Sequence, residues 1–166
     1  MQGQTGGWES LVPPHIRSIQ AYVPSKPDDV LRDMFHCPYI HRLNNNENAL
    51  GPTQEAKAAI AAFDPVAAAI YPSGDSYHLR QRLARQFSLD ADCFLVGNGA
   101  NEVIAFVINA FCQAGDTIIT ADKTFAVYEW VAEFSGYQAK KVPLCEETFD
   151  AQGMLKAIDE RTKILF

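Results

Sequence analysis

The chain is short of positive charge. Its 166 residues carry 14 lysines and arginines against 20 aspartates and glutamates, which gives a net charge of −6. A protein that binds nucleic acid usually presents a basic face to the phosphate backbone. The composition therefore argues against a nucleic-acid partner and favours a small polar ligand. A hydrophobic content of 48% indicates an ordinary globular domain with a real core.

Metal-ligating patterns are also missing. No two cysteines form a Cys-x-x-Cys pair, and no histidine pair completes a metal set. His36 and His41 stand five residues apart in a proline-containing loop, which is poor zinc spacing. We expect no metal site, and reduced, mostly buried thiols as in a cytosolic protein. The cysteines are Cys37, Cys93, Cys112 and Cys145.

A membrane-spanning run is absent too. The longest apolar stretch, near residues 103–112, is broken by Asn109 and reaches only about half of a membrane span. Residues 1–7 are polar and glycine-rich, unlike a signal peptide. We expect a cytoplasmic protein with no membrane partner.

Three segments differ in composition. Residues 1–10 are expected to be a disordered tail, and residues 11–52 a proline-rich arm with one short helix near 28–35. From residue 53 to 166, strands alternate with helices, which predicts an α/β fold with a mainly parallel sheet flanked by helices. The expected strands are 93–96, 117–121, 138–142 and 163–166. The expected helices are 53–63, one starting at 75 or 76, 101–112, 125–134 and 153–159.

The last residues of the chain form an apolar strand. A parallel strand needs neighbours beside it and cover on both faces. We therefore expect the chain to be an N-terminal piece of a longer protein.

Two glycines mark the passage from strand to helix in Leu-Val-Gly-Asn-Gly-Ala-Asn-Glu at 95–102. Such a turn directs several backbone N–H groups at one point, with the positive end of a helix dipole behind them, and this arrangement binds phosphate. Glu102 replaces the third glycine of a dinucleotide-binding fingerprint, and the lysine of a P-loop is absent. By spacing alone, a tight turn without a ligand remains the alternative.

Three further segments carry chemistry. The amide-rich Leu-Asn-Asn-Asn-Glu-Asn-Ala-Leu-Gly-Pro at 43–52 offers many hydrogen-bonding groups, or is a solvated loop. Tyr-Pro-Ser-Gly-Asp at 71–75 precedes a helix start, or is ordinary turn chemistry. Lys-Thr-Phe-Ala-Val-Tyr at 123–128 follows a strand, where open α/β sheets bind ligands, and its phenylalanine either covers a flat ring or belongs to the core.

In this order, the four segments resemble the pyridoxal-phosphate aminotransferases of fold type I (class I/II), above all the histidinol-phosphate aminotransferase family. Tyr-Val-Pro-Ser-Lys-Pro at 22–27, Leu-Arg at 79–80 and Arg-Thr-Lys at 161–163 match it as well. The resemblance covers nearly the whole chain after the tail. It implies an N-terminal arm and substrate-side segment (11–52), followed by the first part of the large, cofactor-binding domain (53–166), incomplete at its C-terminus.

The resemblance also implies residue roles. The backbone amides of Ala100 and Asn101, beside Gly99, would hold the phosphate of pyridoxal 5′-phosphate. Phe125 would stack on its ring, and Tyr71 would reach the phosphate in the neighbouring subunit of a homodimer. Four residues would border the substrate pocket: Tyr22, Asn46, Glu47 and Asn48.

The implied activity is amino transfer from histidinol phosphate to 2-oxoglutarate, in histidine biosynthesis. No catalytic residue is assigned, because no lysine of this chain matches the Schiff-base lysine, which we expect beyond Phe166. We therefore expect the chain alone to be inactive. A related aromatic aminotransferase, a threonine-phosphate decarboxylase, and a non-catalytic module for binding or dimerisation are the alternatives. Ala49 and Lys123 depart from the family, which usually has proline at both positions.

Overall fold

A computed structural model describes residues 7–19 and 24–166. The chain divides into two compact units, Met1–Gln20 with Asp75–Phe166 (unit 1) and Ala21–Gly74 (unit 2), and each is described by itself. The boundary expected between residues 52 and 53 stays a prediction. A short 3-10 helix, η1 (Trp8–Leu11), lies partly within the segment expected to be a tail.

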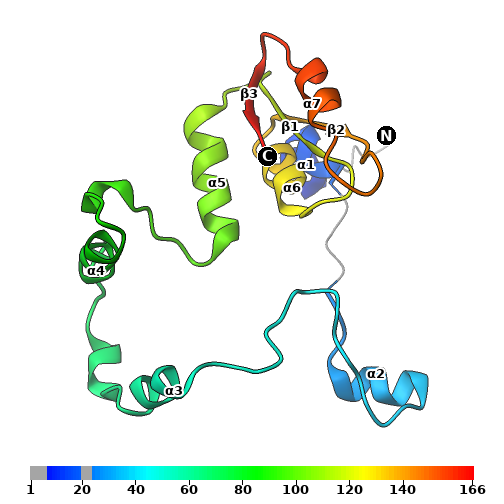
Figure 1. Cartoon of the computed structure of the whole chain (residues 1–166). Helices are drawn as coiled ribbons and strands as arrows, with labels where there is room; N and C mark the ends of the chain where they lie inside the picture. The colour runs from blue at the N-terminus through cyan, green and yellow to red at the C-terminus, as the bar shows by residue number, and fades with distance from the viewer. Residues whose placement is uncertain (1–6, 20–23) are drawn as a thin grey trace, which may run out of the picture. The chain divides into compact units, whose positions relative to one another are not determined.

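Unit 1 contains a three-stranded parallel sheet (Figure 1). Its strands are β1 (Thr117–Ala121), β2 (Gln138–Val142) and β3 (Thr162–Leu165), in the order β2-β1-β3. Thr117 pairs with Gln138 on one side and with Thr162 on the other. Every residue of the central strand β1 is buried, as expected for a strand flanked and covered on both faces. The predicted parallel α/β architecture is confirmed.

Helices cover both faces of this sheet. On one face, Ile118 of β1 packs with Ile108 of α5 (Ala100–Phe111) and Ala132 of α6 (Val127–Phe134). On the other face, Ile119 packs with Met154 of α7 (Ala151–Ala157). Neighbouring residues of a strand point to opposite faces, so one strand contributes to both apolar clusters.

The direction of α5 follows from the turn that joins it to β1. The amide of Asp116 donates to the carbonyl of Gln113 (2.9 Å), and the amide of Gln113 donates to the carboxylate of Asp116 (2.9 Å). The chain reverses there, so α5 runs antiparallel to β1 (Figure 1). The N-terminus of α5 therefore lies toward the carboxyl end of β1, the edge where α/β sheets bind ligands.

The segment that precedes α5 differs from the expectation. The predicted strand at 93–96 is wrong: η3, a 3-10 helix (Ala91–Cys93), leads into extended residues that pair with no strand. The places beside β1 are taken by β2 and β3, and no other strand lies within the described residues. Arg80, on α4 (Tyr77–Phe87), instead holds this stretch by donating to the carbonyl of Ala91 (3.0 Å) and the carboxylate of Asp92 (2.6 Å).

The end of α6 and a short helix that packs against α6 complete the description of unit 1. The predicted stop at Gly136 is confirmed, because this residue has φ 82° and its amide donates to the carbonyl of Glu133 (3.0 Å) after the end of α6. The N-terminal helix α1 (Pro14–Arg17) packs against α6.

Unit 2 holds α2 (Asp28–Phe35), α3 (Gln54–Ala61) and the 3-10 helix η2 (Pro65–Ala69). The predicted cap of α3 is confirmed, since the hydroxyl of Thr53 accepts from the amide of Ala56 (3.2 Å). Arg42 donates to the carboxylate of Asp28 (2.7 Å) and ties its loop to the start of α2. None of the residues described in unit 2 is buried.

No helix in the described part of the chain is long and apolar enough to cross a membrane. Among the same residues, no group of three or more histidine, cysteine and acidic side chains could hold a metal ion. The expectation of mostly buried thiols is wrong: Cys112 alone is buried, Cys37 is half-buried, and Cys93 and Cys145 are exposed. Cys93 lies at the end of η3, where the predicted strand does not form.

Candidate functional site

The glycine turn (residues 97–99) brings the chain into α5. The amide of Gly99 donates to the carbonyl of Gly97 (2.8 Å) and closes the turn. Gly99 has φ 79° and ψ 178°, a backbone conformation that is essentially restricted to glycine. Gly99 is therefore required by its backbone conformation at the N-cap position of α5.

The amide pair, the N–H groups of Ala100 and Asn101, follows the glycine turn. Both residues are exposed and lie in the first turn of α5, whose N–H groups have no acceptor within the helix. No protein group accepts from either amide in the part of the chain that the structure describes. Two accessible donors at the positive end of a twelve-residue helix suit a phosphate group.

Glu102 is the residue that sequence reasoning missed as part of this turn. Its carboxylate accepts from the amide of Asn98 at 2.6 Å, a short charge-assisted hydrogen bond. The available signal was an acidic residue at the third position of a helix, where carboxylates commonly reach back to the preceding amides.

Phe125 lies in the loop between β1 and α6. Its side chain is 49% exposed, and its ring packs edge-on against Tyr128, with centroids 5.9 Å apart. Tyr128 in turn stacks on Phe166, with centroids 4.3 Å apart. Phe125 thus has one side supported by aromatic rings and a free surface, at the same end of the sheet as the N-terminus of α5. The alternative that it is a core residue is wrong.

The amide-rich segment belongs to unit 2. Asn48 is used locally, because its side chain accepts from the amide of Leu50 (3.1 Å) and donates to the carbonyl of Gly51 (3.1 Å). Asn46 has φ 55° and is exposed. Glu47 lines a hollow of about 310 Å³ whose other lining residues are Asp28, Ile40, His41, Arg42, Leu43 and Ala49.

Two predicted site residues stand apart from these. Tyr71, also in unit 2, is 96% exposed, so its ring is available to a partner. Tyr22 lies outside the described residues. The structure thus brings the amide pair and Phe125 to one end of the sheet in unit 1, and Asn46, Glu47 and Asn48 to one loop in unit 2.

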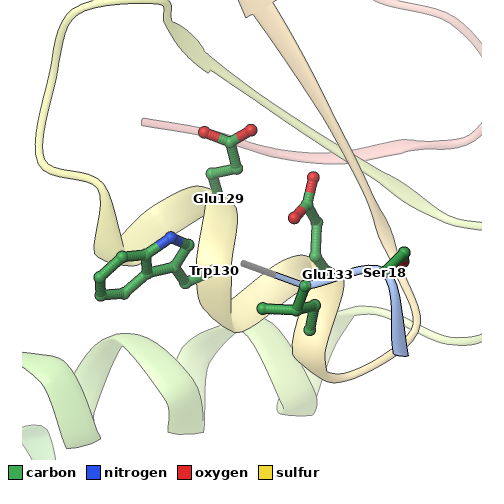
Figure 2. Close-up of a pocket in the computed structure, with 5 residues that line it drawn as sticks. Ser18, Glu129, Trp130 and Glu133 are labelled. Atoms are coloured by element: carbon green, nitrogen blue, oxygen red, sulfur yellow. The ribbon is translucent and has the colours of Figure 1, made fainter. Parts of the chain in front are cut away.

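A second hollow, between α1 and α6, contains none of the predicted site residues. It has a volume of about 370 Å³ and is lined by Ser18, Ile19, Glu129, Trp130 and Glu133. Figure 2 shows the carboxylates of Glu129 and Glu133 extending from the same side of α6. Glu129 accepts from Lys141 (2.6 Å), and this hydrogen bond, ahead of the neighbouring negative charges, raises the pKa of the lysine. Its acidic lining makes this hollow unsuitable for phosphate.

Comparison with known proteins agrees with the geometry. The family profile of class I and II aminotransferases matches residues 40–166. Histidinol-phosphate aminotransferase of Symbiobacterium thermophilum is 39% identical over 153 residues, which are 91% of this chain and 42% of that protein. Histidinol-phosphate aminotransferase 2 of Pseudomonas fluorescens Pf-5 is 35% identical over 165 residues, 98% of this chain and 44% of that protein. The chain thus spans less than half the length of these curated relatives.

Solved structures show the same fold. Histidinol-phosphate aminotransferase from Sinorhizobium meliloti, in complex with pyridoxal-5′-phosphate, has a TM-score of 0.72 at 21% identity, over 92% of this chain and 40% of that chain. N-succinyldiaminopimelate aminotransferase from Mycobacterium tuberculosis has a TM-score of 0.53 at 27% identity, over 68% and 31%. By sequence and by fold, the chain belongs to the class I and II aminotransferases.

Proposed function

We propose that this chain supplies the phosphate-binding turn and the ring-stacking wall of a pyridoxal-phosphate-dependent aminotransferase. The observation that carries the proposal is the amide pair, left unpaired behind Gly99 at the head of α5. The proposed reaction is amino transfer between histidinol phosphate and 2-oxoglutarate in histidine biosynthesis. The names of the curated relatives support this choice of substrate.

The residues present fit the cofactor. The amide pair would receive the phosphate, and Gly99 leaves the approach open, because a Cβ built there would meet no atom within 4 Å. Phe125 would cover one face of the ring. When bound, the cofactor supplies an electron sink for the bond that breaks at the amino-bearing carbon. The chain's own contribution is to fix the phosphate and to keep the ring flat and aligned.

The remaining predicted residues act from the other unit. Tyr71 would reach the phosphate bound by a second subunit, which makes the working protein a homodimer. Asn46 and Glu47 would offer polar groups to the substrate, and Tyr22 keeps the role that the resemblance implies. The side chain of Asn48 shapes the loop through its local hydrogen bonds. The substrates are then a small-molecule amino donor and a 2-oxo acid, in the cytoplasm.

Replacing Ala100 with proline tests the amide pair. Proline is well accepted at the first position of a helix and removes the N–H group there. Loss of one hydrogen bond to a charged phosphate should weaken binding by about 10- to 100-fold. We would titrate the chain with pyridoxamine phosphate, which cannot react with surface lysines as the aldehyde form does, and with pyridoxamine.

A matched proline serves as the control. Gln54→Pro places the same change at the first position of α3, and we expect it to leave affinity unchanged. Pyridoxamine, which lacks the phosphate, should bind the Ala100→Pro variant and the original chain equally weakly. Equal affinity of the original chain for pyridoxamine phosphate and pyridoxamine would refute the proposed phosphate site.

Activity assays test the assignment of chemistry. We propose that the 166-residue chain alone has no transaminase activity, since none of its lysines matches the Schiff-base position. Turnover of histidinol phosphate with 2-oxoglutarate by the purified chain would contradict this. Assays with aromatic amino donors, and for carbon dioxide release from threonine phosphate, distinguish the related activities in the intact protein.

A further inference from the structure

Glu102 closes the glycine turn in an unusual way. In a capping box, a glutamate at the third helical position accepts from the amide of the N-cap residue. Here the amide of the N-cap residue, Gly99, already donates to the carbonyl of Gly97 (2.8 Å). The carboxylate of Glu102 reaches one residue further and accepts from Asn98 (2.6 Å). The amides of Asn98 and Gly99 are thereby engaged, and the amide pair beyond them is left for a ligand.

Gly97 lies directly beside the carboxylate of Glu102. Unlike Gly99, it has no positive φ, so its backbone would accept another residue. A Cβ at this position would instead lie 3.0 Å from Oε2 of Glu102 and 3.1 Å from Cγ2 of Val103. With glycine at this position, the carboxylate of Glu102 keeps its place, and a larger residue would push it and Val103 aside.

We propose that Glu102 is a positioning residue, which holds the turn so that the amide pair stays aligned on the phosphate of the cofactor. This inference rests on the proposed function. The negative charge of Glu102 opposes a phosphate at the same helix end, whereas its hydrogen bond orders the turn. A geometric role therefore requires the oxygen acceptor more than the charge, and glutamine keeps the acceptor while it removes the charge.

Two substitutions separate these effects. Glu102→Ala removes the acceptor and should weaken binding of pyridoxamine phosphate by up to about tenfold, because the free energy of this one hydrogen bond limits how strongly it favours the aligned turn. Glu102→Gln should keep the affinity within about threefold of the original chain, because the amide oxygen still accepts. As a control for net charge, Glu133→Ala on α6 should leave affinity unchanged. Tighter binding by both Glu102 variants would show that charge dominates, and would overturn the proposal.

The substitution Gly97→Ala tests the contact between Gly97 and Glu102 by changing the glycine. The added methyl group displaces the carboxylate and should weaken binding about as much as Glu102→Ala does. In the Glu102→Ala background the same change should cost clearly less, because the hydrogen bond is already lost and only the contacts with Cγ2 of Val103 and Cβ of residue 102 remain. Equal costs in the two backgrounds would contradict the coupling between Gly97 and Glu102.

Hydrogen exchange of the Asn98 amide gives a readout that needs no ligand. The amide should be protected in the original chain and in Glu102→Gln, and exposed to exchange in Glu102→Ala. Equal exchange in all three proteins would overturn the inference while leaving the phosphate site standing. Lost protection without lost affinity would overturn the positioning role. Failure of the original chain to prefer the phosphorylated probe would overturn the proposed function, and with it this inference.

Discussion

At the scale of single residues, the carboxylate of Asp159 accepts hydrogen bonds from three groups. It accepts from Lys140 (2.5 Å), and also from the hydroxyl of Thr162 and the amide of Arg161, both at 3.0 Å. The hydrogen bond from Lys140, followed by that from Thr162, lowers the pKa of Asp159 from 3.8 to about 2. Asp159 thereby joins β2 to the turn that begins β3.

We expect acid to weaken the contacts that Asp159 makes between β2 and the start of β3. The folded pKa lies below the unfolded one, so the stabilisation is complete above about pH 4 and is lost as the pH falls through about 2. We expect Asp159→Asn to lower the free energy of unfolding at pH 7 and to match the original chain near pH 2. Urea unfolding measured across this range checks it. Asp33→Asn, on the exposed side of α2, is the control, and a pH-independent difference for Asp159→Asn would contradict the assignment.

At the scale of elements, α7 begins in a way that overrides helix propensity. Asp150 caps it by accepting from the amide of Gly153 (2.9 Å). The carboxylate folds directly over Gly153, where a Cβ would collide with it and would also lie 3.1 Å from Cγ1 of Val142. A glycine in this helix therefore serves the cap and the packing of α7 on the sheet.

Gly153→Ala should therefore destabilise the protein. Propensity alone would favour alanine by about 1 kcal/mol. We expect the opposite sign, because the methyl group displaces a cap of about 1 kcal/mol and crowds β2. Chemical denaturation measures the change, and in an Asp150→Ala background the penalty should shrink. A stabilising Gly153→Ala would show that α7 moves away from the sheet without cost.

The elements also show which features a short stretch of sequence determines and which it does not. The helix predicted near 28–35, the cap at Thr53 and the stop at Gly136 are confirmed, because each depends on contacts within a few residues. The strand predicted at 93–96 is wrong, because pairing depends on residues far along the chain, and β1 pairs with β2 and β3 instead. The apolar spacing of α4 is real, yet Phe87 is 58% exposed, so periodicity did not indicate burial.

Some residues of the candidate site could be predicted from the sequence, and others could not. The glycine turn and Phe125 could be found because two glycines before a helix, and an aromatic residue after a strand, occupy recurrent places in α/β folds. The hydrogen bond from Asn98 to Glu102 could not, because it requires the actual path of the turn. The roles of Tyr71, Tyr22, Asn46 and Glu47 rest on the resemblance and stay predictions.

At the scale of the whole molecule, the two units differ in how much apolar surface they bury. The core of unit 1 is built around Ile108, Ile118 and Ile119, all fully buried. In unit 2, Leu43, Leu50 and Tyr71 are each at least 90% exposed. Apolar burial is the dominant favourable term in folding, so unit 2 has little stability of its own.

Limited proteolysis should reveal this difference. Trypsin should cut first in unit 2, after Arg32, Arg42 or Lys57, and leave a resistant product that begins at Ala58 and contains α4 to β3. Mass spectrometry of a time course identifies the cuts. Lys140 and Lys141, in β2, are the internal comparison, because cleavage there requires the sheet to open. Early cleavage at these two lysines would contradict the assignment of stability to unit 1.

By itself, the sequence determined the family, the parallel α/β class and the position of the glycine turn at the start of α5. These depend on short motifs and on apolar periodicity, which local backbone preferences translate directly into helices, strands and turns. Only the tertiary structure decided which strand lies in the centre, that residues 94–96 stay unpaired, and that Glu102 engages Asn98. The strand order and the unpaired segment come from competition among distant segments for the same neighbours, which a local pattern does not record. The hydrogen bond between Asn98 and Glu102 depends instead on the exact path of the backbone through the turn.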